Sequence, residues 1–103
     1  MDTYLATVIS NEQVADKIFR IELQGDVVKE MNTPGQFVNI KVSNSYEFLL
    51  RRPISICEIN KEKNTFVMIY RADGAGTKKI SELEAGNSVD VLGPLGKGYD
   101  VYT

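Results

Sequence analysis

Hydrophobic and polar residues alternate along most of this chain with a period of two, which is typical of β-strands. Short segments of this kind, rich in β-branched and aromatic residues, are separated by polar or glycine-containing turns. The polar residues 11–13 predict the first of these connections. The alternating segments predict six strands, over residues 4–9, 17–23, 36–42, 51–59, 65–71 and 88–92.

Three other segments depart from the strand pattern. Residues 27–31 predict a short helical turn, and residues 78–84 predict the one α-helix, with Gly86 closing it as a left-handed cap. Residues 93–98 predict a rigid glycine-rich loop. The fold class expected is therefore all-β, a six-stranded antiparallel Greek-key barrel with one short α-helix, because closure removes exposed strand edges.

Length and charge restrict the partners of the chain. Its 103 residues suit a single domain over 1–103. Twelve basic residues against 14 acidic ones give a formal charge of −2, which offers no basic surface for nucleic acid or for an anionic membrane. No apolar run approaches the roughly 20 residues that span a bilayer. The sequence thus excludes nucleic acid and membrane as partners.

The cysteine and histidine counts restrict the chemistry. Cys57 is the one cysteine and there is no histidine, so no zinc, haem or iron–sulfur site is expected from this chain alone. The absence of histidine also removes the commonest general acid–base, and no catalytic residue is predicted. The N-terminus lacks the pattern of a signal peptide, so a reducing cytoplasm is the expected location.

The segment 51–56, with the sequence Arg-Arg-Pro-Ile-Ser-Ile, carries the first candidate binding residues. An arginine presents a planar, always charged group that suits phosphate oxygens, and the proline that follows fixes the backbone. Strand alternation places Arg52 and Ile54 on one face and Ser55 on the other, where its hydroxyl is able to hydrogen-bond a ligand ring nitrogen. An edge strand with two solvated arginines also explains the pattern.

The segment 74–77, Gly-Ala-Gly-Thr, is the second candidate. Glycines let backbone amides approach an anion, and a helix N-terminus presents free N–H groups. Lys78 and Lys79 are then expected in the first turn, where the helix dipole disfavours each cation by about 0.3–1 kcal/mol and a bound pyrophosphate would offset that cost. A tight turn with Thr77 as N-cap and two solvated lysines is the alternative.

Residues 69–71, Ile-Tyr-Arg, end the fifth predicted strand and lead into the glycine-rich turn. Tyr70 is placed to flank an aromatic cofactor and Arg71 to meet a second phosphate. The alternative is that Tyr70 belongs to the core or rim of the barrel. Cys57, in the middle of a strand, is predicted to be a structural thiol and not a nucleophile.

Taken in order, these motifs resemble those of the ferredoxin–NADP reductase superfamily. Within it, the chain looks like the N-terminal domain of the dihydroorotate dehydrogenase B electron-transfer subunits, over about residues 4–99. The motifs that carry the resemblance are Arg52-Pro53-Ile54-Ser55, Tyr70-Arg71, Gly74-Ala75-Gly76-Thr77, Leu83, Gly86 and Gly93-Pro94-Leu95-Gly96.

The resemblance implies a barrel that binds FAD, and it implies that the fourth predicted strand contacts this cofactor. Arg52 would hold the pyrophosphate, and Ser55 would lie near the reactive N5 of the flavin. Pro53 and Ile54 would line the isoalloxazine. Many members of the superfamily have a tyrosine that stacks on the flavin at the position of Ile54, whereas the dihydroorotate branch is expected to be aliphatic there.

The resemblance also implies which residues contact the rest of the cofactor. Ile69, Tyr70 and Arg71 would contact its middle, and Gly76 with Thr77 would cap its phosphates. In the family, a nicotinamide-binding domain and a cysteine cluster for a [2Fe–2S] centre follow the barrel. Neither is in this sequence, so the 103 residues are expected to hold FAD, but not NAD or the cluster, and not to turn over substrate alone.

The intact subunit that the resemblance implies passes electrons between NAD(H), FAD, the iron–sulfur centre and a partner dihydroorotate dehydrogenase in pyrimidine biosynthesis. Related subunits of ferredoxin–NADP, sulfide dehydrogenase and sulfite reductase systems share the barrel and remain alternatives. So does a non-catalytic β-barrel interaction module without flavin. Surface that the missing domains would cover predicts, in addition, a homodimer.

Overall fold

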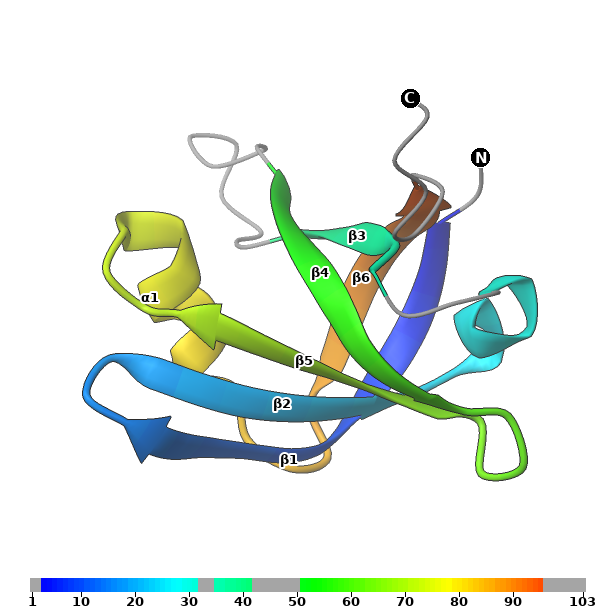
Figure 1. The fold of residues 1–103 in the computed structure, drawn as a ribbon, viewed down its shortest axis with the longest axis horizontal. Coiled ribbons are helices and arrows are strands. Elements are labelled where there is room, and N and C mark those ends of the chain that lie inside the picture. The colour runs from blue at the N-terminus through cyan, green and yellow to red at the C-terminus, as the bar shows by residue number, and fades with distance from the viewer. Residues whose placement is uncertain (1–2, 32–34, 42–50, 96–103) are drawn as a thin grey trace.

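Six antiparallel strands close into a barrel in the order β1-β2-β5-β4-β3-β6 (Figure 1). The computed structural model describes residues 3–31, 35–41 and 51–95. The consecutive strands β3, β4 and β5 are neighbours, with β6 beside β3 and β2 beside β5, which is a Greek-key order and confirms the expected fold class. The elements are β1 Thr3–Ala15, β2 Ile18–Gln24, the 3₁₀ helix η1 Asp26–Glu30, β3 Phe37–Lys41, β4 Arg51–Asn60, β5 Thr65–Arg71, α1 Ala75–Ser81 and β6 Ser88–Leu95.

The core lies inside the barrel and follows from the alternation of the strands. Ile21 and Leu23 of β2 and Phe66 and Met68 of β5 point inward and are at most 1% exposed. The helix η1 lies where residues 27–31 predicted a helical turn, and its Val27 and Val28 join the same core. Burial of these side chains is the main term that holds the strands together.

The predicted connection at residues 11–13 is wrong, because β1 continues to Ala15. The strand shifts register between Val8 and Ser10 and then pairs with β2 as far as Ala15↔Ile18. In this part of the ribbon most β1 side chains are exposed. Polar residues are therefore compatible with a strand there, and the turn falls at Lys17, whose φ is 61°.

The helix lies three residues earlier than predicted, over Ala75–Ser81, because Gly74 and not Thr77 is its N-cap. Thr77 Oγ1 accepts a hydrogen bond from Gly74 N at 3.1 Å, and Lys78 N donates to Gly74 O at 2.9 Å. Lys78 and Lys79 consequently fall in the last turn, where the helix dipole favours cations. The expectation that they oppose the dipole in the first turn is wrong.

The last strand is longer than predicted. β6 runs through Gly93 and Pro94, which are joined by a cis peptide bond, and Leu95 pairs with Phe37 of β3. Residues 96–98 of the expected glycine-rich loop lie outside the described part of the chain. Gly86 has the positive φ that was expected, 95°, but it lies in the turn before β6 and not at the end of the helix.

Candidate functional site

The strands that carry the predicted binding residues diverge at one end of the barrel. Among the described residues, β4 pairs with β5 from Asn60↔Thr65 to Ile56↔Met68. The earlier half of β4 pairs instead with β3, from Phe37↔Ser55 to Lys41↔Arg51. Figure 1 shows the two strands separating toward the side on which α1 lies. The start of β4, residues 51–55, and the end of β5, residues 69–71, are therefore not paired with each other; these are the diverging ends of the two strands.

The outer face of β4 presents Pro53 and Ser55, which are both exposed. Ile54 points the other way and is 5% exposed, so its side chain belongs to the core cluster. The backbone of Arg52 pairs with Ile40 of β3, while its side chain lies outside the described part of the structure. The strand therefore offers a hydroxyl and a proline ring to a ligand on the outside, and Ile54 supports that surface from within.

The end of β5 has the same alternation. Ile69 and Arg71 point outward, with Ile69 47% exposed, and Tyr70 points inward. Arg71 Nε lies 3.1 Å from Asp73 Oδ2 in an exposed ion pair. An exposed pair of this kind is worth little, so an incoming phosphate is able to compete with Asp73 for the guanidinium.

Tyr70 lies in the core, which agrees with the alternative prediction that this residue belongs to the core or rim of the barrel. Its ring stacks on Phe19 of β2, with ring centroids 5.8 Å apart and planes 18° from parallel. Its hydroxyl donates a hydrogen bond to Asn11 Oδ1 at 3.0 Å. Burial raises the pKa of Tyr70 to about 12 from the ordinary 10.0, and the Asn11 hydrogen bond acts in the lowering direction. A direct contact of Tyr70 with the cofactor stays a prediction.

This pKa predicts a loss of stability in alkali. In the unfolded chain Tyr70 loses its proton near pH 10, whereas in the folded chain it keeps the proton to about 12. The stabilising contribution of Tyr70 is therefore complete below about pH 10 and lost as the pH rises toward 12. Urea denaturation of the wild type and of Tyr70→Phe is expected to give midpoints that converge across this range. A constant difference would contradict the buried, protonated hydroxyl.

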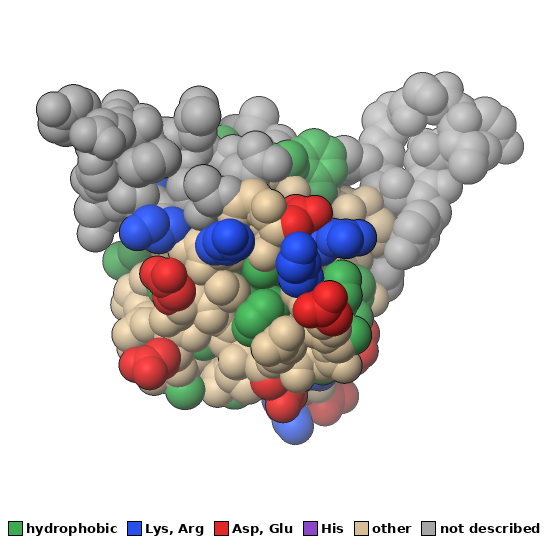
Figure 2. Space-filling view, turned by 90° about the vertical axis from the view of Figure 1, so that its left-hand side faces the viewer, with side chains coloured by type: hydrophobic (Ala, Val, Ile, Leu, Met, Phe, Trp, Pro, Cys, Tyr) green, Lys and Arg blue, Asp and Glu red, His purple; other side chains and the backbone are tan. Residues whose placement is uncertain are grey.

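Basic side chains gather beside the diverging strands. Lys78 and Lys79 of α1 and Arg71 of β5 are all exposed. Figure 2 shows Lys and Arg side chains forming a band across this end of the molecule, with Asp and Glu mainly below it. Thr77 is half-buried and its hydroxyl also donates to Gly74 O at 3.1 Å. A band of cations at this end favours an anionic ligand.

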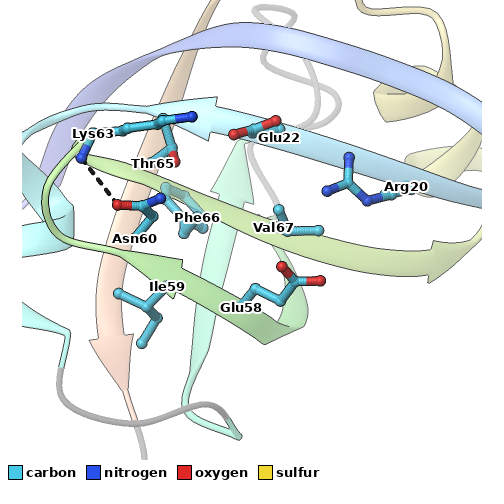
Figure 3. Close-up of a pocket in the computed structure, with 9 residues that line it drawn as sticks. All are labelled: Arg20, Glu22, Glu58, Ile59, Asn60, Lys63, Thr65, Phe66 and Val67. Atoms are coloured by element: carbon cyan, nitrogen blue, oxygen red, sulfur yellow. Dashed lines mark hydrogen bonds between the residues drawn. The ribbon is translucent and has the colours of Figure 1, made fainter.

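A concavity lies on the outer face of β2, β5 and β4, away from the predicted cofactor residues (Figure 3). It measures about 170 Å³, and Val67 lies in its lining between Glu22 and Glu58, its neighbours in register. Arg20 and Lys63 contribute charges of the opposite sign. None of the predicted cofactor residues lines this cavity, and its mixed charges favour no single ligand.

The sequence profile of a family described as an oxidoreductase FAD-binding domain matches residues 5–99. The chain belongs to this family. At 52% identity over 94 residues, it is similar to the dihydroorotate dehydrogenase B (NAD⁺) electron-transfer subunit of Bacillus mycoides strain KBAB4. The match covers 91% of this chain and 36% of that protein, so the chain spans about a third of the length of this relative.

Solved structures of other proteins share the fold. An NADH-dependent reduced ferredoxin–NADP oxidoreductase superimposes with a TM-score of 0.81 at 25% identity, over 92% of this chain and 34% of that one. The cytochrome P450 reductase of Amycolatopsis superimposes with a TM-score of 0.72 at 26% identity, over 93% of this chain and 29% of that one. The barrel of this FAD-binding domain is therefore one that oxidoreductases carry as a part of longer chains.

The described residues fit the cofactor for which the family is named. FAD requires an apolar surface for a ring system, hydrogen-bond donors for ring atoms and cations for a pyrophosphate. The diverging ends of β4 and β5 provide Pro53 and Ile69, the hydroxyl of Ser55 and the guanidinium of Arg71. Among the described residues there is no group of three or more residues able to hold a metal ion, and no helix long and apolar enough to cross a membrane.

One residue of this region was missed by the sequence analysis. The sequence predicts a polar connection at Asn11, but Asn11 lies on β1 and hydrogen-bonds both Tyr70 and the end of α1. No local signal marks it, because a polar residue beside Glu12 and Gln13 has the pattern of a solvated turn. Its partners lie too far away in the sequence to be recognised from the chain alone.

Proposed function

We propose that this chain is the FAD-binding domain of the electron-transfer subunit of a dihydroorotate dehydrogenase B. The observation that carries the proposal is the 52% identity to such a subunit over 94 residues, together with membership of the FAD-binding family. The whole subunit would pass electrons between NAD(H), FAD, an iron–sulfur centre and a partner dihydroorotate dehydrogenase. We assign NAD(H) and the iron–sulfur centre to parts of such a subunit outside this barrel.

The part of this chain would be to bind and orient FAD, while the bound flavin supplies the redox chemistry. On β4, Arg52 would bind the pyrophosphate, and the exposed Ser55 would place its hydroxyl near the flavin ring. Pro53 would cover one edge of that ring. Ile54 would act from the core, where it supports the backbone of the outer surface.

The other half of the site would come from β5 and α1. Ile69 has the exposed apolar surface, and Arg71 the charge, to contact the middle of the cofactor. Gly76 and Thr77 would meet the phosphates beside the exposed lysines of α1. Tyr70 would shape the site from inside the barrel, through its contacts with Phe19 and Asn11.

Titration of the purified chain with FAD tests the proposal. Saturable changes of flavin absorbance and fluorescence at one FAD per chain are expected. The alternative, a β-barrel interaction module without flavin, predicts no saturation. If the 103 residues fail to bind FAD and a chain extended to the full length of the Bacillus relative also fails, the assignment is contradicted.

The barrel alone does not select the electron acceptor among the related systems. Subunits of ferredoxin–NADP, sulfide dehydrogenase and sulfite reductase complexes are the alternatives, and the high identity to dihydroorotate dehydrogenase B subunits favours the first assignment. Reconstitution of the full-length subunit with a dihydroorotate dehydrogenase tests it. Reduction of NAD⁺ to NADH with dihydroorotate as electron donor is expected, and its absence in a complex that retains FAD and the iron–sulfur centre would contradict this partner.

We further propose a cytoplasmic location and a homodimer of this barrel. Cys57 is exposed and unpaired, which suits a reducing compartment.

The homodimer is proposed from the surface of β1. Leu5 and Ile9 on this strand are 74% and 41% exposed, an apolar surface that a second copy is able to cover. Sedimentation velocity over a wide concentration range is expected to show a monomer–dimer equilibrium, weakened in Leu5→Glu. A monomer at every concentration would contradict the dimer.

A further inference from the structure

Asn11 connects three elements that are distant in the sequence. Its Nδ2 donates one hydrogen bond to Ile80 O and another to Leu83 O, both at 2.9 Å, at the C-terminal end of α1. Its Oδ1 accepts the hydrogen bond from the Tyr70 hydroxyl at 3.0 Å. All three contacts are partly buried. One side chain of β1 thus joins the last turn of the helix to the end of β5.

An amide in this orientation satisfies all three partners. The two carbonyls of α1 need donors, and the Tyr70 hydroxyl donates to the remaining oxygen. Ile80 O also accepts a hydrogen bond from Leu83 N at 3.1 Å, so the amide of Asn11 adds a tertiary contact to the backbone turn that ends α1. α1 has seven residues, a length at which a helix depends on tertiary contacts for its stability.

We propose that Asn11 is a positioning residue of the cofactor site. Tyr70 and Ile80 enclose the segment 71–79 in the sequence, and this segment carries Arg71, Gly76 and Thr77. By hydrogen-bonding both ends, Asn11 holds this segment against the barrel in the arrangement that meets FAD. The inference rests on the proposed function for its ligand, and on the three hydrogen bonds for its geometry.

The test compares Asn11→Asp with Asn60→Asp. Aspartate at position 11 keeps an acceptor for Tyr70 but presents carboxylate oxygens to two carbonyls, so the helix loses its anchor. Asn60 accepts a hydrogen bond from Lys63 N in the exposed β4–β5 turn, and aspartate there keeps that acceptor. The two variants therefore have the same shape change and the same added charge. Asn11→Asp is expected to raise the Kd for FAD by about tenfold relative to Asn60→Asp.

Amide hydrogen exchange without FAD provides the second measurement. In Asn11→Asp, exchange is expected to accelerate in residues 75–83 while the amides of β2 and β5 exchange as in the wild type. A general destabilisation of the barrel would accelerate exchange everywhere, so the two effects are distinguishable. Tightening of FAD binding, or an FAD affinity equal to that of Asn60→Asp, would overturn the proposal.

The exchange experiment also separates this proposal from the proposed function. Unchanged exchange of residues 75–83 in Asn11→Asp would overturn the positioning role, whatever the wild type binds. Failure of the wild-type and extended chains to bind FAD would contradict the proposed function instead. In that case accelerated exchange confined to residues 75–83 would still establish Asn11 as the anchor of α1, but with no cofactor to position.

Discussion

Replacement of Arg52 by alanine is expected to weaken FAD binding by about ten- to a hundredfold, the largest functional effect that we predict. Hydrogen bonds to charged groups contribute about 1.5–3 kcal/mol, and each 1.4 kcal/mol changes the dissociation constant about tenfold. Arginine also offers two parallel donors to a pyrophosphate, an arrangement that no other side chain reproduces. Titration with FAD, followed by flavin fluorescence, measures the change.

Arg51→Ala is the matched control for this experiment. It removes the same charge from the same strand, one residue away, so it reports the general effect of a cation on an anionic ligand. A small increase in the FAD dissociation constant is expected for Arg51→Ala. Equal losses in both variants would mean that only net charge matters, and would contradict the specific role of Arg52.

Leu23→Ala is expected to lower the free energy of unfolding by about 2–5 kcal/mol, the largest effect on stability that we predict. Leu23 of β2 is 0% exposed and lies in the barrel core. The substitution removes apolar surface from the core and leaves a cavity, because neighbouring strands in a closed barrel are held in register and relax little. Urea denaturation measured by circular dichroism gives the change in stability.

Leu5→Ala makes the same chemical change on the outside of the barrel. Leu5 of β1 is 74% exposed, so its truncation is expected to alter stability by no more than about 0.5 kcal/mol. The measurement belongs at a protein concentration where the chain is monomeric, because Leu5 is also part of the proposed dimer surface. Equal losses for Leu5→Ala and Leu23→Ala would contradict the inward and outward faces of these two strands.

The fold class was predictable because alternation records which face of each strand is buried. The segment 65–71 predicts β5 with its observed bounds, and 17–23 predicts β2 to within one residue. The errors lie where local pattern and tertiary context disagree. Residues 11–13 look like a turn but continue β1, since the extended ribbon tolerates polar side chains that face water.

The members of the candidate site are a prediction from the sequence, and their arrangement on the strands and on α1 comes from the structure. The motifs at 52–55, 69–71 and 76–77 come to the diverging ends of β4 and β5 and to α1. Alternation does not indicate which face of a strand turns inward when both faces carry apolar residues. Tyr70 therefore has two interpretations from the sequence, and closure of the barrel places both Tyr70 and Ile54 inside.

The sequence alone predicts the barrel, the single helix and the resemblance to a flavin-binding family. Each of these predictions depends on periodicity or on motifs that are short and local. The start of α1 at Ala75, the burial of Tyr70 and the anchor at Asn11 depended on the tertiary structure. Asn11 and its partners on α1 are separated by 69 and 72 positions in the sequence. Contacts over such distances exist only once the strands have closed, since closure, and not local preference, brings the end of β1 beside the helix.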